Sequence, residues 1–207
     1  MDNYKTEQEA FWAGKFGNEY VTRNKSALLL ASNIQFFTKI IPRTMAVKSL
    51  IEFGSNIGMN LHAIKALLPD VELSAIEINQ NAVSELEKFQ DILVYPQSIL
   101  DFSPNRTWDM VLIKGVLIHI NPECLKQVYD RLYRSSNRYL CVAEYYNPTP
   151  VEVLYRGHSG KLFKRDFAGE LLDDYPDLRL VDYGFAYHRD TNFPQDDITW
   201  FLLEKAR

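Results

Sequence analysis

Two glycines and a distant glutamate have the clearest chemical meaning in this sequence. Gly54 and Gly58 follow a short apolar run, residues 47–53, and precede a segment whose apolar residues recur at helical spacing. A glycine turn lets a ligand approach the backbone, and the helix after it presents free N–H groups. A carboxylate about 20 residues further on can bind a ribose, and Glu77 stands there. The pattern predicts a nucleoside site.

The spacing of the glycines disfavours a dinucleotide. The dinucleotide fingerprint G-x-G-x-x-G needs a glycine where this sequence has Asn56. With Glu52 included, the string reads E-x-G-x-N-x-G, which resembles the first motif, [DE]-x-G-x-G-x-G, of class I S-adenosylmethionine-dependent methyltransferases. The resemblance implies S-adenosylmethionine as the cofactor and leaves an NAD-dependent dehydrogenase as a remote alternative.

The same resemblance implies roles for residues that follow later strands. Glu77 would bind both ribose hydroxyls, and Ile78 would pack on the adenine. Ser98 stands where the family commonly has an aspartate that accepts a hydrogen bond from the adenine amino group. Lys114 would line the methionine half through its backbone rather than through its amine. The implied cofactor contacts are Glu52, Gly54, Ser55, Asn56, Gly58, Glu77, Ile78, Ser98, Ile99, Lys114, Gly115 and Val116.

Several segments outside these motifs, including FWAGKFGNEYVTRN and DYGFAYHRD, resemble the bacterial pseudaminic acid biosynthesis-associated methylases. That resemblance runs nearly end to end. It implies a small-molecule substrate: a nonulosonic acid, a nucleotide-sugar or another surface-polysaccharide intermediate. Two alternatives stay open, a protein methyltransferase that acts on a glycosylated surface protein and a cofactor-binding pathway partner without catalysis.

Methyl transfer to a hydroxyl or an ammonium requires a group that removes a proton. The candidates for this base are His119, Tyr146, His158 and Asp166. His119 follows Gly115 by four residues, where the fourth strand passes into a loop that faces the acceptor. A single histidine is also commonly a packed or capping residue, so this structural alternative stays open.

The segment between the fifth strand and the next helix, residues 144–166, is too long for a simple connection and is therefore predicted to be functional. Arg156 with Lys161 could clamp a carboxylate or a phosphate, because arginine binds both in a bidentate manner. Tyr145, Tyr155 and Arg23 complete the predicted substrate contacts. The alternative is a solvated loop whose charges serve solubility.

Alternating strand and helix patterns from residue 47 onward predict parallel βαβ units and a doubly wound α/β sheet. Two strand-like runs near the C-terminus have no helix between them, so they should form an antiparallel hairpin at the sheet edge. This hairpin also resembles that of the seven-stranded Rossmann-like sheet of the methyltransferase family. The expected fold is therefore a mostly parallel seven-stranded sheet over residues 46–207.

Residues 1–45 are expected to form a helical N-terminal segment. Helical patterns cover residues 6–14 and the stretch from Asn24 or Ser26 to Pro42. The aromatic, glycine-containing segment between them could be a lid over a ligand, or it could pack its aromatic residues on the core. The sequence leaves both interpretations open, and it does not give the oligomeric state.

The net charge of -4 and the pI near 5.6 provide no basic field for a nucleic acid. The apolar runs are too short to span a membrane, and the polar start MDNYKTEQE is unlike a signal peptide, so a cytoplasmic location is expected. Cys124 and Cys141 have neither disulfide-framework nor metal-site spacing. We therefore predict no metal, and a buried thiol at Cys141.

Overall fold

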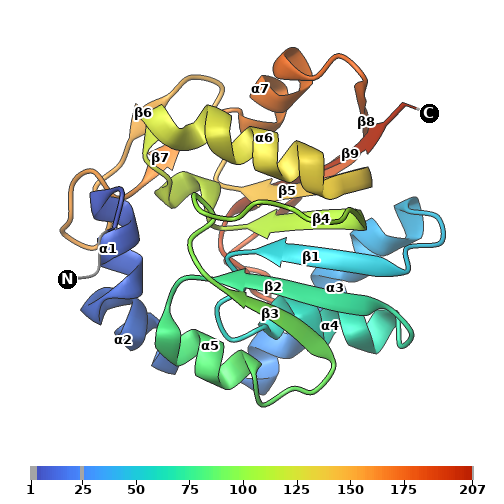
Figure 1. The fold of residues 1–207 in the computed structure, drawn as a ribbon, viewed down its shortest axis with the longest axis horizontal. Coiled ribbons are helices and arrows are strands. Elements are labelled where there is room, and N and C mark those ends of the chain that lie inside the picture. Colours follow the sequence, from blue (N-terminus) through green and yellow to red (C-terminus); the bar gives the residue numbers. More distant parts are fainter. Residues whose placement is uncertain (1–3, 24–25, 207) are drawn as a thin grey trace.

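The fold is a seven-stranded sheet covered by helices on both faces (Figure 1). The computed structural model describes residues 4–23 and 26–206. One apolar core lies between the sheet and α3, α4 and α5, and a second lies between the sheet and α6 and α7. The helices are α1 (Glu7–Ala13), α2 (Lys15–Arg23), α3 (Ala27–Ile40), α4 (Met59–Leu67), α5 (Gln80–Leu86), α6 (Leu125–Ser135) and α7 (Phe167–Asp174), with short 3-10 turns η1 (Ile41–Arg43), η2 (Leu117–His119) and η3 (Pro122–Cys124).

The strand order confirms the predicted fold class. The sheet runs β3-β2-β1-β4-β5-β9-β8. Its strands are β1 (Ser49–Phe53), β2 (Glu72–Glu77), β3 (Ile92–Pro96), β4 (Trp108–Lys114), β5 (Ser136–Glu144), β8 (Leu178–Ala186) and β9 (Ile198–Lys205). The strand β9 is antiparallel to both of its neighbours, β5 and β8, and it forms the predicted hairpin with β8. The strand order reverses between β1 and β4, where open α/β sheets bind ligands.

Local signals in the sequence explain where the elements begin. The Ser26 side chain caps α3 by accepting from the N–H of Leu29, and the Asn79 side chain caps α5. Asn121 caps η3, in which Pro122 is the first residue. The central strands β1, β4 and β5 are buried on both faces, as their continuous apolar runs predict. The predicted burial of Cys141 is confirmed.

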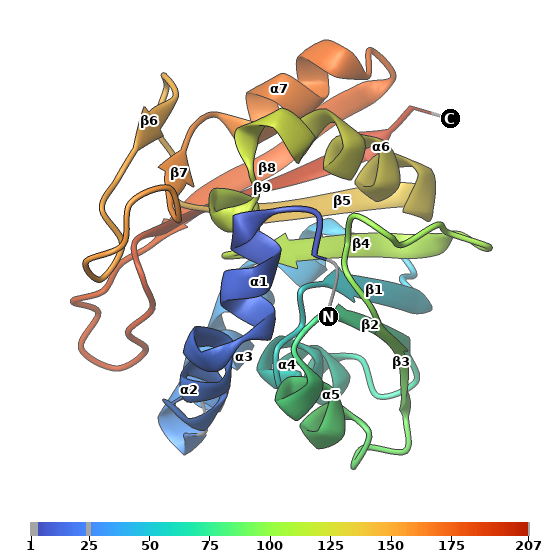
Figure 2. The same ribbon diagram turned by 60° about the vertical axis from the view of Figure 1, so that its left-hand side comes forward.

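The N-terminal segment contains one helix more than the sequence predicted. Residues 15–23, expected to lie in a connection, form α2 after Gly14 ends α1. Asn24, named at the end of that segment, lies outside the described residues. Both helices lie beside the carboxyl ends of the parallel strands (Figure 2). None of the helices in the described part of the chain combines the length and apolar character needed to cross a bilayer.

The long insert after β5 forms a second, two-stranded sheet from β6 (Val151–Glu152) and β7 (Phe163–Lys164). This small sheet stands apart from the main sheet (Figure 2), and the segment between its two strands contacts α1. Gln8 Nε2 donates to the carbonyl of Gly160 at 2.8 Å, and Lys161 pairs with Glu7 at 3.2 Å. The insert is therefore packed against the N-terminal segment.

Candidate functional site

A cavity of about 510 Å³ lies at the carboxyl ends of the central strands. Its size is typical of sites for small ligands and cofactors. The β1–α4 loop, the ends of β2 and β4, the turn after β3, and η2 form one side of it. The N-terminal helices and the β8–β9 connection form the other side. The lining residues discussed below are Glu9, Trp12, Asn33, Gly54, Ser55, Asn56, Asn60, Glu77, Ile78, Asn79, Ser98, Ile99, Lys114, Gly115, Val116, His119, Gln195 and Asp196.

The loop after β1 depends on its first glycine. Gly54 has a φ of +77°, and a Cβ built there would lie 2.7 Å from a methyl group of Val116. The N–H groups of Gly54 and Ser55 both donate to the carbonyl of Ile76, at 2.9 and 3.1 Å. The loop is thereby held against β2. A side chain at position 54 would push it away from the β4 loop.

Glu77 is buried in the cavity wall, with 8% of its surface exposed. Its Oε2 accepts from the N–H of Asn56 at 2.7 Å, and its Oε1 accepts from the N–H of Asn79 at 2.7 Å. Burial raises the pKa of Glu77, and these backbone donors oppose the rise. Each carboxylate oxygen keeps further acceptor capacity for a ligand hydroxyl.

Two predicted cofactor contacts lie behind the cavity wall instead of in it. Glu52 is fully buried; its Oε1 accepts from Asn60 Nδ2 at 2.6 Å, whereas its Oε2 has no hydrogen-bond partner within the described part of the chain. Burial raises the pKa of Glu52 to about 8, so the carboxyl is mostly protonated at neutral pH. Gly58, at a φ of +80°, begins α4. Both residues shape the loop from beneath.

The protonation of Glu52 predicts how stability depends on pH. Between about pH 4.5 and 8, the folded chain holds a proton on Glu52 that the unfolded chain releases, so rising pH lowers the free energy of unfolding. Glu52→Gln, a neutral isostere, is therefore expected to melt several degrees above the wild type at pH 8.5 and at nearly the same temperature at pH 5. Thermal melts across this range test it, with the exposed Glu72→Gln as control. An equal shift at both pH values would contradict the assignment.

Lys114 brings a partly buried ammonium to the cavity. Desolvation lowers the pKa of Lys114, and the carboxyl groups of Glu52, Asp196 and Glu144, where they are ionised, oppose the effect. The amine lies 5.4 Å from the ring centre of Phe36, and within the described residues it makes neither a hydrogen bond nor an ion pair. The Lys114 side chain, in addition to its backbone, is therefore available to an anionic group of a ligand.

His119 is the only predicted base in the cavity lining formed by the described residues. Its Nδ1 lies 2.6 Å from the carbonyl oxygen of Lys161. A carbonyl only accepts, so Nδ1 carries the proton and Nε2 remains an acceptor. The His119 ring packs against both Trp12 and Tyr155, and burial lowers the pKa of His119 to about 4. The imidazole is therefore neutral at physiological pH.

The other predicted bases lie outside the cavity. Tyr146 is 43% exposed and lies against the ring of Phe201. Asp166 is the N-cap of α7, where its Oδ1 accepts from the N–H of Gly169. His158 packs against the aromatic rings of α1 and α2. Of the four candidates for the base, His119 is therefore the one that the described residues place in the cavity lining.

None of the predicted substrate contacts lines the cavity either. Tyr155 packs behind it against Trp12, and the Arg156 side chain lies over Tyr155. The remaining three lie near other parts of the protein: Tyr145 lies near the Asp196 side chain, Lys161 pairs with Glu7, and Arg23 lies over Phe16 and Tyr20. The insert thus supports the cavity from outside, and its charges do not enter it.

Several lining residues were not among the predicted contacts. Glu9 and Trp12 come from α1, and Gln195 and Asp196 come from the connection between β8 and β9. Gln195 Nε2 donates to Asn33 Oδ1 on α3 at 2.8 Å. The one local signal is Thr6-x-x-Glu9, a capping box that marks the start of a helix. It does not indicate that the helix folds over the sheet.

Buried polar atoms without partners also surround the cavity. Gln8 Oε1, Trp12 Nε1, Asn56 Oδ1 and Asn60 Oδ1 have no hydrogen-bond partner among the described residues. Leaving such groups unpaired costs about 1–3 kcal/mol each. A polar ligand that supplies partners would recover that cost, so the arrangement fits a ligand with several donors and acceptors beside an apolar surface.

The sequence matches no family model and no curated protein. Solved structures do match. The plantazolicin methyltransferase BpumL with bound S-adenosylhomocysteine (SAH) is 13% identical, with a TM-score of 0.66 over 96% of this chain and 95% of that one. A Burkholderia thailandensis 1,6-didemethyltoxoflavin-N1-methyltransferase, also with S-adenosylhomocysteine, is 8% identical, with a TM-score of 0.70 over 100% and 94%. The glycopeptide N-methyltransferase MtfA is 9% identical, with a TM-score of 0.63 over 86% and 94%.

At these identities the likeness establishes the fold, a Rossmann-like sheet of the kind found in S-adenosylmethionine-dependent methyltransferases. The compounds bound in these structures differ, since they include a desmethylplantazolicin analogue and 1,6-didemethyltoxoflavin. The resemblance to the pseudaminic acid-associated methylases stays a prediction.

Proposed function

We propose that this protein is an S-adenosylmethionine-dependent methyltransferase whose acceptor is a nonulosonic acid or another sugar intermediate of surface polysaccharides. The observation that carries the proposal is the buried Glu77 carboxylate, fixed by two backbone N–H groups beside the glycine loop at the reversal of the strand order. The fold shared with structures that hold S-adenosylhomocysteine supports it.

The lining residues fit such a cofactor from end to end. Ile78 and Ile99 offer apolar side chains to an adenine, and Glu77 offers acceptors to a ribose. The glycine loop and Lys114 would contact the amino acid end of the cofactor, whose carboxylate would pair with the Lys114 ammonium. The unpaired Asn56 and Asn60 oxygens suit donors of the ligand.

The bound cofactor supplies an activated methyl group, so the chain mainly positions and desolvates the acceptor. Correct positioning can contribute about 7–11 kcal/mol to lowering a barrier. His119 Nε2 accepts the proton that a hydroxyl or ammonium acceptor loses, and the Lys161 carbonyl keeps the ring in the required tautomer. The N-terminal helices close the cavity from water as a lid over residues 46–207.

Product analysis tests the proposal. Purified protein is incubated with S-adenosylmethionine and a panel of nonulosonic acids, their nucleotide-activated forms and glycosylated or bare peptides. Formation of S-adenosylhomocysteine and a product heavier by one methylene with a sugar acid supports the proposal. Turnover with peptides alone would indicate a protein methyltransferase, and binding without turnover would indicate a non-catalytic partner.

The glycine loop gives a further prediction. Gly54→Ala would place a Cβ against Val116 and is expected to weaken S-adenosylmethionine binding at least about tenfold, the equivalent of 1.4 kcal/mol. Gly157→Ala is the matched control, because its φ of +88° carries similar backbone strain, but nothing lies within 4 Å of the added Cβ. Calorimetric titration compares them. Equal affinities in both variants would exclude a close approach of ligand to the loop.

A further inference from the structure

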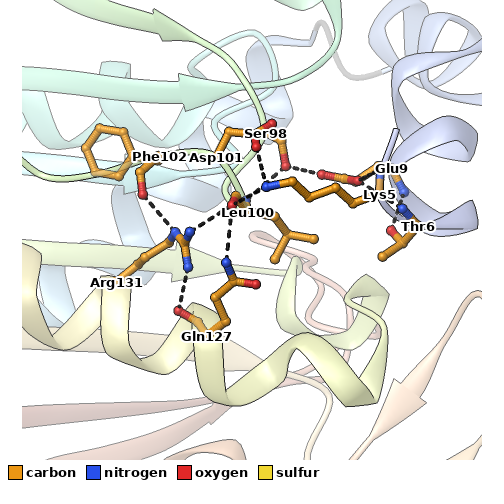
Figure 3. Close-up of polar contacts among 9 residues, drawn as sticks. All are labelled: Lys5, Thr6, Glu9, Ser98, Leu100, Asp101, Phe102, Gln127 and Arg131. Atoms are coloured by element: carbon orange, nitrogen blue, oxygen red, sulfur yellow. Dashed lines mark hydrogen bonds and ion pairs between the residues drawn. The ribbon is translucent and has the colours of Figure 1, made fainter. Parts of the chain in front are cut away.

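The turn after β3 carries a contact that links it to the N-terminal helix. The Ser98 hydroxyl donates to Glu9 Oε1, and the Ser98 oxygen accepts from the N–H of Leu100 at 2.9 Å (Figure 3). Ser98 is buried at 7% exposure and Glu9 at 8%, and both line the cavity. The Ser98 oxygen is neutral and already accepts from Leu100, so it is a weaker acceptor for an amino group than the charged Glu9 carboxylate.

The Glu9 carboxylate is held firmly in this position. Its Oε2 accepts from the N–H groups of Lys5 at 2.6 Å and Thr6 at 3.0 Å in the capping box of α1. Lys5 also reaches across, donating to the Leu100 carbonyl at 3.0 Å and pairing with Asp101. The start of α1 is thus bound to the turn that it faces.

The turn itself is fixed from its other side. Arg131 on α6 donates to the carbonyls of Phe102 at 2.7 Å and Leu100 at 2.8 Å (Figure 3). Residues 98–102 therefore lie between two elements that are far from them in the sequence. The carboxylate is pre-organised at this point of the cavity wall, next to Ile99.

We infer that Glu9 accepts a hydrogen bond from the exocyclic amino group of the cofactor's adenine. A residue of the N-terminal helix then distinguishes adenine from other bases. This inference rests on the proposed function and assigns to Glu9 the contact that the sequence predicted for Ser98. A 6-amino group donates to the carboxylate, whereas a 6-oxo group presents a second acceptor and is repelled. Binding of the cofactor and closure of α1 are then coupled through one side chain.

The test compares S-adenosylhomocysteine with S-inosylhomocysteine, which carries a 6-oxo group, by calorimetry. The wild type is expected to prefer the adenosyl compound at least about tenfold, a discrimination typical of one buried hydrogen bond. Glu9→Gln should bring the preference close to one, because the amide accepts from one base and donates to the other. Glutamine at this position preserves a capping box, so α1 is retained.

Ser98→Ala is the matched control and should keep most of the wild-type preference. A full preference in Glu9→Gln, or its loss in Ser98→Ala alone, would overturn the inference. If Glu9→Gln does not fold, Glu9→Asp, whose carboxylate is withdrawn by one methylene, should show a reduced preference. Failure of the wild type to bind either compound would instead overturn the proposed function, and the inference with it.

Discussion

Glu77→Ala is expected to weaken S-adenosylmethionine binding by roughly 10- to 150-fold for each ribose hydroxyl contact that is lost. This range follows from the 1.5–3 kcal/mol that a hydrogen bond to a charged group contributes. The wild-type carboxylate is buried and faces the cavity, so water does not replace it easily. Isothermal titration of wild type and variant measures the difference.

The same substitution leaves two backbone donors, the N–H groups of Asn56 and Asn79, without their acceptor. Denaturant unfolding must therefore accompany the titration, to show that the variant is folded. Glu72→Ala is the matched control, since Glu72 lies on the same strand and its side chain is 71% exposed. Unchanged affinity for S-adenosylmethionine in a folded Glu77→Ala variant would show that Glu77 does not bind the ribose.

His119→Asn is expected to lower turnover by about 10²–10⁴ with little change in cofactor affinity, the range for loss of a general base. Asparagine can still donate to the Lys161 carbonyl, so the η2 turn should be preserved while the Nε2 acceptor is lost. His158→Asn is the matched control, because that ring packs against α1 and α2 outside the cavity. Single-turnover rates with an acceptor from the panel measure the effect.

The pH profile tests the same residue. A general base acts unprotonated, and the pKa of His119 near 4 keeps it so throughout the neutral range. His119 should therefore cause no loss of rate between about pH 8 and 5, whereas an unperturbed histidine would titrate near 6.5. Full activity in His119→Asn, or a wild-type rate that falls with an apparent pKa near 6.5 lost in that variant, would contradict this role.

The sheet and its glycine loop could be predicted from the sequence because their signals are local. Apolar runs define the buried strands, and Asn79 or Ser26 marks the start of a helix within a few residues. The position of Glu77 beside the glycine loop could be predicted from its distance along the chain to Gly54. In a parallel sheet, successive strand ends meet at one edge, so sequence spacing translates directly into position.

The helix α2 could not be predicted from the sequence, because Gly17 within it is a residue that is typical of turns. Gly17 lies inside α2, where an added Cβ would come within 1.7 Å of the Trp12 carbonyl oxygen and 2.8 Å of Asn79 Nδ2. The glycine is therefore required by the close packing of α2 on α1 and Asn79. That packing depends on a contact between distant segments, which local composition does not report.

The partners of the insert, residues 144–166, could not be predicted from the sequence for the same reason. Its histidine and lysine suggested substrate contacts, yet His158 packs on Phe11 and Lys161 pairs with Glu7, about 150 residues earlier in the chain. Glu9 likewise meets Ser98 across 89 residues. Residues that come together only when the N-terminal segment docks have no common local pattern.

A structure of the protein crystallised with S-adenosylhomocysteine is the most direct test of nucleoside binding at Glu77. We expect a nucleoside at the carboxyl ends of β1 and β2, with both ribose hydroxyls within about 3.2 Å of the Glu77 carboxylate. A ligand bound elsewhere, or a ribose that does not touch Glu77, would contradict it.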